Sequence, residues 1–182
     1  MIVLPIDQVI ADYCEKTHDE NREYFAVRGK FDGDRRSRIY GMIGECMVKA
    51  HFGLPATVVI NHDGSTDGGV DMLYAGLAID IKTVVQDPPS LPEHKSNITK
   101  SQHHDPNSKC TAYILAALNK GPWTVTIAGW ILKASVFPLA ILRMEGDPIY
   151  ADSGRFLFNV RSTLYELRND QLMSAEGLKA RK

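Results

Sequence analysis

Cysteine, long apolar runs and a surplus of either charge are all scarce in this sequence of 182 residues. The three cysteines, Cys14, Cys46 and Cys110, form no C-x-x-C pair, which is typical of reduced thiols and not of a disulfide framework. No apolar run approaches the length of a membrane span. Since residues 1–10 carry no basic stretch, we expect no signal peptide and a cytoplasmic protein.

The charges of the chain almost cancel, with 21 Lys and Arg against 22 Asp and Glu and a formal net charge of -1. A protein that coats nucleic acid through bulk charge is basic, so this balance argues against that class. It is compatible with a nuclease, in which basic residues act locally and metal-binding carboxylates lower the total. The length predicts one compact domain over residues 1–182.

The hydrophobic pattern predicts an α/β fold. Apolar residues at helical spacing predict a short helix from about Pro5 to Lys16 and a longer one from about Arg35 to Phe52, ended by Gly53 and Pro55. Strands are expected where β-branched and apolar residues are bounded by turn residues, and a polar helical tail is expected last. The expected strands cover 57–60, 70–74, 77–85, 111–118, 124–132 and 155–160, and the tail covers 164–178.

The stretch from Gln86 to Lys109 has few apolar residues and holds four prolines. Loops of this length are unusual in a compact domain unless they are functional or disordered. Two interpretations stay open, a surface excursion without function and a loop that contacts substrate. A zinc site is not predicted, because His94, His103, His104 and Cys110 lack paired metal-ligand spacing.

The strands on either side of Ala75-Gly76 predict a β-hairpin. A two-residue turn there places Asp71 opposite Asp80, and the alternation of side chains puts Lys82 on the face of Asp80. Two carboxylates in these positions repel each other unless a cation bridges them or one of them keeps a proton.

Such a pair beside a lysine is typical of a phosphodiester-cleaving centre. Mg²⁺ prefers one or two carboxylates, several waters and phosphate oxygens, and it makes a bound water more acidic. Lys82 would orient that water or neutralise developing charge. The alternative is a simple surface ion pair between Asp80 and Lys82 on an edge strand, since D-x-K is a common tripeptide.

The longer predicted helix adds a third acid, Glu45, in a row of otherwise apolar residues. One interpretation is that Glu45 pairs with Lys49, one turn later. The other is that it points toward Asp71 and Asp80 as a further ligand or water contact.

These residues resemble the PD-(D/E)XK nuclease superfamily, also called restriction-endonuclease-like, and in particular its small phage and bacterial members. The pattern of that superfamily is a helix that bears Glu, then an Asp, then a (D/E)-x-K strand. Valine, where the superfamily pattern has proline, precedes the Asp here. The matching segments are Gly41-Met42-Ile43-Gly44-Glu45, Gly68-Gly69-Val70-Asp71 and Asp80-Ile81-Lys82-Thr83, within residues 35–132.

The resemblance implies a mixed central β-sheet flanked by helices, and Mg²⁺ or Mn²⁺ held by Asp71, Asp80 and the backbone carbonyl of Ile81. Glu45 would lie nearby as a further ligand, and Lys82 would be the catalytic lysine. The implied activity is metal-dependent hydrolysis of DNA, with RNA a less expected substrate, in the host cytoplasm if the chain is phage-encoded. A homodimer or higher oligomer would suit cleavage of a duplex. The alternative is a nucleic-acid-binding or assembly protein that keeps the fold without cutting.

Basic residues suggest where nucleic acid would bind. Arg35, Arg36 and Arg38 lie at the start of the longer predicted helix, where the helix dipole disfavours positive charge. This mismatch favours phosphate binding over a solvated helix start. Lys95 and Lys100 are further candidate contacts, from the polar stretch.

Overall fold

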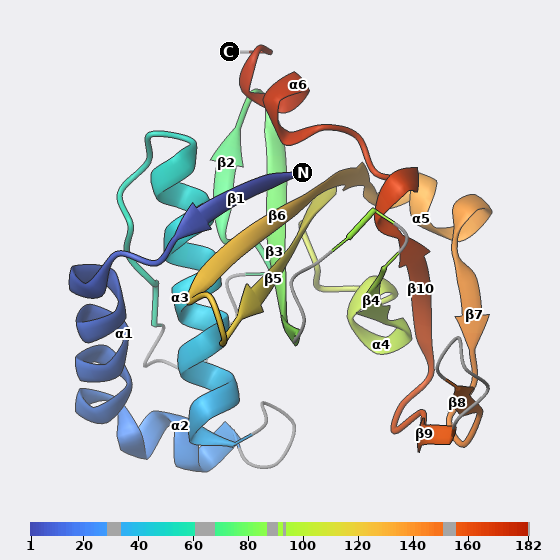
Figure 1. Cartoon of the computed structure of the whole chain (residues 1–182), viewed down its shortest axis with the longest axis horizontal. Coiled ribbons are helices and arrows are strands. Elements are labelled where there is room, and N and C mark those ends of the chain that lie inside the picture. The colour runs from blue at the N-terminus through green and yellow to red at the C-terminus, as the bar shows by residue number, and fades with distance from the viewer. Residues whose placement is uncertain (29–33, 61–67, 87–90, 93, 151–155, 182) are drawn as a thin grey trace.

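A five-stranded mixed β-sheet forms the centre of the protein (Figure 1). The computed structural model describes residues 1–28, 34–60, 68–86, 91–92, 94–150 and 156–181. Strand β3 is parallel to β5, and the other pairings in this sheet are antiparallel. The sheet has the order β1-β6-β5-β3-β2 and consists of β1 (Ile2–Pro5), β2 (Met72–Tyr74), β3 (Leu77–Gln86), β5 (Ala112–Asn119) and β6 (Thr124–Leu132).

Helices lie on one side of this sheet and a smaller sheet with short helices lies on the other (Figure 1). The first group is α1 (Gln8–Glu20), α2 (Arg22–Arg28) and α3 (Arg35–His51). The second group is β4 (Lys95–Thr99), α4 (Lys100–His103), α5 (Lys133–Leu139), β7 (Ile141–Arg143) and β10 (Leu164–Arg168), with strand order β4-β10-β7. The remaining elements are β8 (Pro148–Tyr150), β9 (Phe156–Asn159), η2 (Asn169–Gln171) and α6 (Ala175–Lys179).

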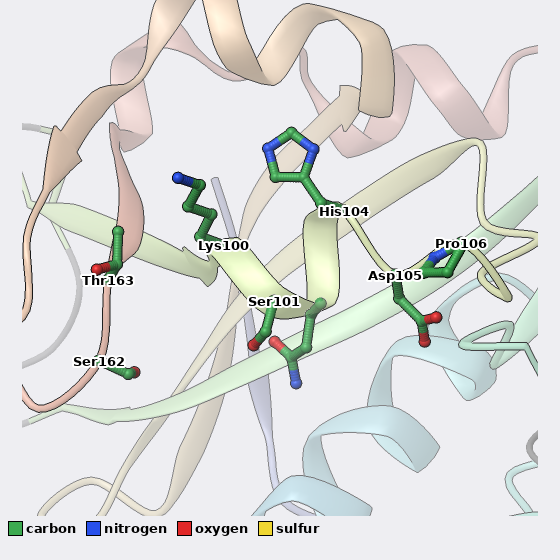
Figure 2. A pocket seen from close by; sticks show the side chains of 8 residues that line it. Lys100, Ser101, His104, Asp105, Pro106, Ser162 and Thr163 are labelled. Atoms are coloured by element: carbon green, nitrogen blue, oxygen red, sulfur yellow. The ribbon is translucent and has the colours of Figure 1, made fainter.

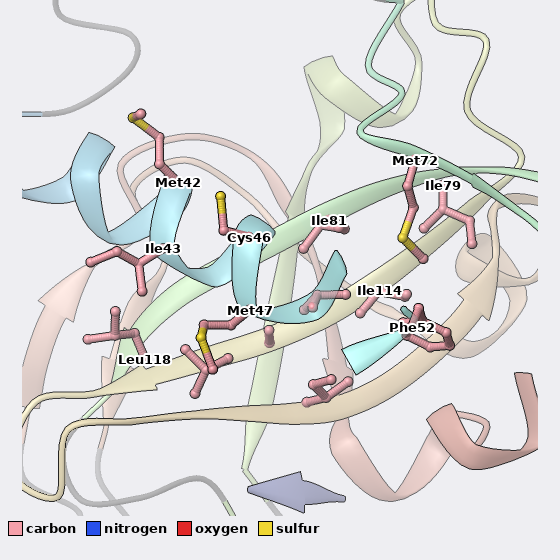
Figure 3. Packing of buried hydrophobic residues seen from close by; sticks show 14 of the residues in the cluster. Met42, Ile43, Cys46, Met47, Phe52, Met72, Ile79, Ile81, Ile114 and Leu118 are labelled. Carbon is pink, nitrogen blue, oxygen red and sulfur yellow. The ribbon is translucent and has the colours of Figure 1, made fainter. Parts of the chain in front are cut away.

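Asp34 is the N-cap of helix α3, and its carboxylate accepts a hydrogen bond of 2.8 Å from the Ser37 amide. It ends before Gly53, whose φ of 71° is the left-handed conformation that glycine adopts readily. Its apolar side chains pack against β3 and β5, as Figure 3 shows for Met42, Ile43, Cys46, Met47, Ile79, Ile81 and Ile114. This packing fixes the helix that carries Glu45 against the strand that carries Asp80.

Glycine at position 44 allows the close approach of α3 to β3. A Cβ atom at Gly44 would lie 2.1 Å from the hydroxyl oxygen of Thr83, which is far inside van der Waals contact. The opposite face of the sheet has its own core around Tyr113, Leu115 and Ile131. That second core is closed by β4, β10 and α5.

The prediction of an α/β chain with a mixed sheet flanked by helices is confirmed at that level. The longer predicted helix agrees with α3 to one residue. The first helix starts later than predicted, because Asp7 caps it through the Val9 amide while residues 2–5 pair with β6. The hairpin register is confirmed from Tyr74–Leu77 to Met72–Ile79, but the predicted pair of Asp71 and Asp80 is not part of the ladder.

Three predicted elements are wrong. Residues 57–60 form no strand. The polar stretch after Gln86 contains β4 and α4, because pairing with β10 buries Ile98 completely. The expected tail begins as strand β10, in which Tyr165 and Leu167 are buried with strand periodicity, and only Ala175–Lys179 is helical. The predicted strand 155–160 is found as β9 from Phe156, and residue 155 lies outside the described residues.

No helix in the described part of the chain combines the length and the apolar character that crossing a membrane requires.

Candidate metal and catalytic site

The candidate site lies along one edge of β3. Strand β5 pairs with β3 from Ile79 to Gln86, whereas β2 on the opposite edge pairs only with Leu77–Ile79. From Asp80 onward, the β2 edge of β3 therefore has no strand partner among the described residues. Backbone groups of β3 on this edge are available to side chains and ligands.

Asp71 binds to this edge of β3 through two hydrogen bonds. Its amide donates a hydrogen bond of 2.9 Å to the Ile79 carbonyl, and its carboxylate accepts one of 2.6 Å from the Ile81 amide. The β2–β3 ladder ends at Met72, so Asp71 lies one residue beyond it and does not pair with Asp80 as a strand partner. Because the N–H and C=O of a strand residue point to the same side, the Ile81 carbonyl faces the same edge.

The surroundings of Asp71 are crowded with negative charge. Burial raises its pKa well above the usual value, and the nearby charges of Glu45 and Asp80 raise it further. The hydrogen bond from the Ile81 amide and the positive charge of Lys82 act in the opposite direction. The structure thus brings together the four residues that the sequence predicted for catalysis, with Asp71 between the others.

Asp80 and Lys82 form an ion pair, as the alternative interpretation predicted, but Asp80 is buried and β3 is not the edge strand of the sheet. The ammonium nitrogen of Lys82 lies 2.8 Å from a carboxylate oxygen of Asp80, and Asp80 is only 7% exposed. Gly69 passes beside this pair with φ of 66°, and a Cβ atom there would lie 3.6 Å from the same Asp80 oxygen. Glycine at position 69 therefore lets the backbone run past Asp80 in a conformation that other residues rarely adopt.

Glu45 forms the ion pair with Lys49 that was the first of its two interpretations. Its carboxylate lies 2.5 Å from the ammonium of buried Lys49, which also donates to the carbonyl of Thr57. Glu45 and Asp71 in addition line one cavity of about 180 Å³, together with Lys49. The sequence predicted Lys49 only as an ion-pair partner. Its place in this cavity depends on the segment around Thr57, whose carbonyl accepts a hydrogen bond from the Lys49 ammonium.

The donor atoms at this edge suit a hard cation. Two carboxylates, Asp71 and Asp80, and the carbonyl of Ile81 are oxygen donors of the type that Mg²⁺ and Mn²⁺ take, with water completing the coordination. Within the described ranges no three His, Cys, Asp or Glu side chains are grouped to hold a metal by themselves. A cation here would thus depend on the backbone carbonyl and on water. Burial is the main cause of the raised Asp71 pKa, and the charges of Glu45 and Asp80, which a cation would offset, raise it further.

Several residues near Asp80 were not predicted. The ammonium of Lys133 donates to the Ser108 hydroxyl over 3.1 Å, and a Cβ atom at Gly69 would lie 3.6 Å from that hydroxyl. Burial and the charge of Asp80 both raise the pKa of the Cys110 thiol. The β3–β5 and β5–β6 pairings bring these residues near Asp80, and nothing in the local sequence indicates this.

The arginines predicted to bind nucleic acid have partners on the helical side. Arg35 forms an ion pair of 2.8 Å with Asp19. The guanidinium of Arg38 donates to the Phe25 carbonyl and lies 5.7 Å from the centre of that ring. These contacts give both residues a role in joining α3 to α1 and α2, while Arg36 is exposed.

The two predicted lysine contacts lie on the other side of the sheet (Figure 1). Lys95 forms an ion pair of 2.9 Å with Glu166 of β10, and Lys100 begins α4. The five predicted basic residues therefore do not form one continuous surface.

No family model, curated protein or solved structure matches this chain.

Proposed function

We propose that the protein is a metal-dependent nuclease of the PD-(D/E)XK type that hydrolyses phosphodiester bonds in DNA. The observation that carries this proposal is the placement of Asp71, whose carboxylate binds the Ile81 amide at the edge of β3 between the charges of Glu45, Asp80 and Lys82. The order of these residues in the chain follows the superfamily pattern, and this order is the second support for the proposal.

Asp71, Asp80 and the Ile81 carbonyl would hold Mg²⁺ or Mn²⁺, which when bound makes water more acidic and offsets charge on a phosphate. Lys82 holds Asp80 in position through their ion pair and supplies a positive charge beside the reacting phosphate. Glu45, fixed by Lys49, adds an acceptor for the attacking water from the α3 side. The Asp71 carboxylate is oriented by the Ile81 amide, which keeps it turned toward the strand edge.

The activity test is cleavage of plasmid and linear DNA with Mg²⁺ or Mn²⁺. Asp80→Ala and Lys82→Ala should each lower the rate by about a hundredfold or more, the usual effect of removing one charge-stabilising group. Lys16→Ala, on α1, is the matched control and should keep full activity, because its exposed side chain pairs only with Glu20. Equal rates in the parent protein, Asp80→Ala and Lys82→Ala would refute the proposal.

A second candidate is a nucleic-acid-binding or assembly protein that keeps this fold and does not cut. It is favoured by the ion pairs of Glu45 with Lys49 and of Asp80 with Lys82, which compensate two of the three acids without a cation. Calorimetric titration with Mn²⁺ separates the two candidates. Binding that disappears in Asp71→Asn supports the nuclease, and the absence of such binding supports the second candidate.

A further inference from the structure

A second hollow lies on the side of the sheet opposite α3, with a volume of about 870 Å³. One wall is α4 with the residues that follow it, and the other is the turn before β10 (Figure 2). In that figure the Lys100 side chain extends between those of Thr163 and His104. The residues that matter for its chemistry are Lys100, Ser101, His104, Pro106, Ser162 and Thr163.

The two walls are joined by hydrogen bonds. The Lys100 amide donates to the Thr163 carbonyl over 2.9 Å, and the Thr99 hydroxyl accepts from the Gln102 amide at the start of α4. Strand β4, which leads into α4, pairs with β10 along all five of its residues. The hollow is therefore built on paired strands, so its polar groups keep fixed relative positions.

The charge in this hollow favours an anion. Lys100 forms no ion pair among the described residues, and neither does Arg161, which lines the adjoining hollow next to Ser162. Asp105 also lines the hollow and offsets the charge of Lys100, so Arg161 supplies the positive charge in excess; the Asp105 carboxylate accepts a hydrogen bond of 2.8 Å from the Asn107 amide. One or two cations among several hydroxyls suit a singly charged phosphodiester.

The hollow is connected to the candidate catalytic site through buried rings. His103, which precedes His104, is buried and lies 3.4 Å from the Tyr113 hydroxyl. Tyr113 is the strand partner of Asp80 in the β3–β5 pairing. His104 is itself held by the Tyr165 hydroxyl at 2.7 Å. The hollow thus lies on the face of the sheet that carries Asp80 and Lys82.

We infer that this hollow binds a phosphodiester group of the DNA strand. This group neighbours the phosphodiester bond that is cut. Lys100 and the Thr163 hydroxyl contact the phosphate oxygens, and the sugar or base lies against Pro106 and the His104 ring. The role in cleavage rests on the proposed function, whereas the binding of the strand does not.

The test is the affinity for short fluorescent single-stranded DNA, measured by anisotropy without divalent cations in an Asp80→Asn background. Lys100→Gln in that background should weaken binding by about tenfold, the size of one hydrogen bond to a charged group. It should also lower the slope of log affinity against log salt by about one. Lys16→Gln, on the helical side, is the matched control and should change neither quantity. Lys100 is exposed and begins α4 through its backbone, so unchanged unfolding temperature checks that the variant is folded.

The outcomes separate this inference from the proposed function. If the parent binds DNA and Lys100→Gln binds equally well, the inference is wrong even if the protein cuts DNA. If Lys100→Gln weakens binding while the parent never cuts with Mn²⁺, the inference holds and the proposed function fails. A parent that binds no oligonucleotide overturns the inference. An RNA oligonucleotide of the same sequence forms the second arm, and a loss on Lys100→Gln seen only with RNA overturns DNA as the ligand.

Discussion

Lys49 and Lys82 each hold one acid of the candidate site, Glu45 and Asp80, at ion-pair distance. Asp71 has a backbone partner in the Ile81 amide, and its pKa is raised by burial and by those two neighbouring acids. At the scale of single residues, Asp71 is therefore the acid of the site that most favours its protonated form, whereas Glu45 and Asp80 each have a lysine partner. A cation at the strand edge would act first on this residue.

Gly44, at the contact between α3 and β3, allows a prediction about stability. Gly44→Ala should lower the free energy of unfolding by about 1 to 3 kcal/mol, the usual range for overpacking a core. The reason is the contact of 2.1 Å that a new Cβ atom would make with Thr83. For a chain of this size, thermal unfolding should move down by about 2 to 4 °C for each kcal/mol.

Gly41 supplies the control on the same helix. A Cβ atom there meets nothing within 4 Å, so Gly41→Ala should gain about 0.5 to 1 kcal/mol from helix propensity. If both substitutions change the unfolding temperature equally, the close contact between α3 and β3 is not as described.

Among the elements, the short strand β2 shapes the site. It begins only at Met72 and therefore leaves the edge of β3 from Asp80 onward to the Asp71 side chain. The smaller sheet is held together by the ion pairs of the buried Glu166 of β10. Its carboxylate lies 2.9 Å from the Lys95 ammonium and 3.0 Å from the Arg143 guanidinium, which joins β4, β10 and β7.

Because of the hydrogen bonds of Glu166, we expect the stability that it gives this sheet to depend on pH. Burial raises the pKa of Glu166, but hydrogen bonds from Arg143 and Lys95 outweigh this and lower it below the usual value. A depressed pKa contributes stability above the unfolded-state value, and this is lost as the pH falls through the folded-state value. Glu166→Gln should therefore cost about 1 to 3 kcal/mol at pH 7 and progressively less under acid conditions.

The measurement is urea unfolding of the parent and Glu166→Gln between pH 7 and pH 3. Glu145→Gln is the control, because Glu145 is an exposed acid in a turn near the same sheet. A stability difference for Glu166→Gln that stays constant over this range would contradict the assigned hydrogen bonds.

The sequence predicted those elements whose signals are local. The β2–β3 register follows from a two-residue turn, and α3 follows from helical spacing that Gly53 and Pro55 bring to an end. Strand β4 was missed because Ile98 gains its burial from β10, far along the chain. The same limit applies to the site, where Asp71, Asp80 and Lys82 came from the hairpin pattern. The positions of Ser108 and Lys133 depend on long-range packing.

Across the whole molecule, the candidate site joins the two faces of the central sheet. Glu45 reaches Asp71 from the face covered by α3, and Asp80 with Lys82 belongs to the face covered by the smaller sheet and α4. The proposed strand-binding hollow shares the second face, while Arg35 and Arg38 are engaged with α1 and α2 on the first. DNA bound in that hollow would leave these helix contacts in place.

The central claim is that a divalent cation binds at this edge, and diffraction from crystals soaked in Mn²⁺ tests it most directly. The account predicts an anomalous peak between the carboxylates of Asp71 and Asp80, in contact with the carbonyl oxygen of Ile81. Asp71→Asn crystals soaked in the same way should lose the peak. Ordered carboxylates in the parent crystals with no anomalous peak between them would contradict the account.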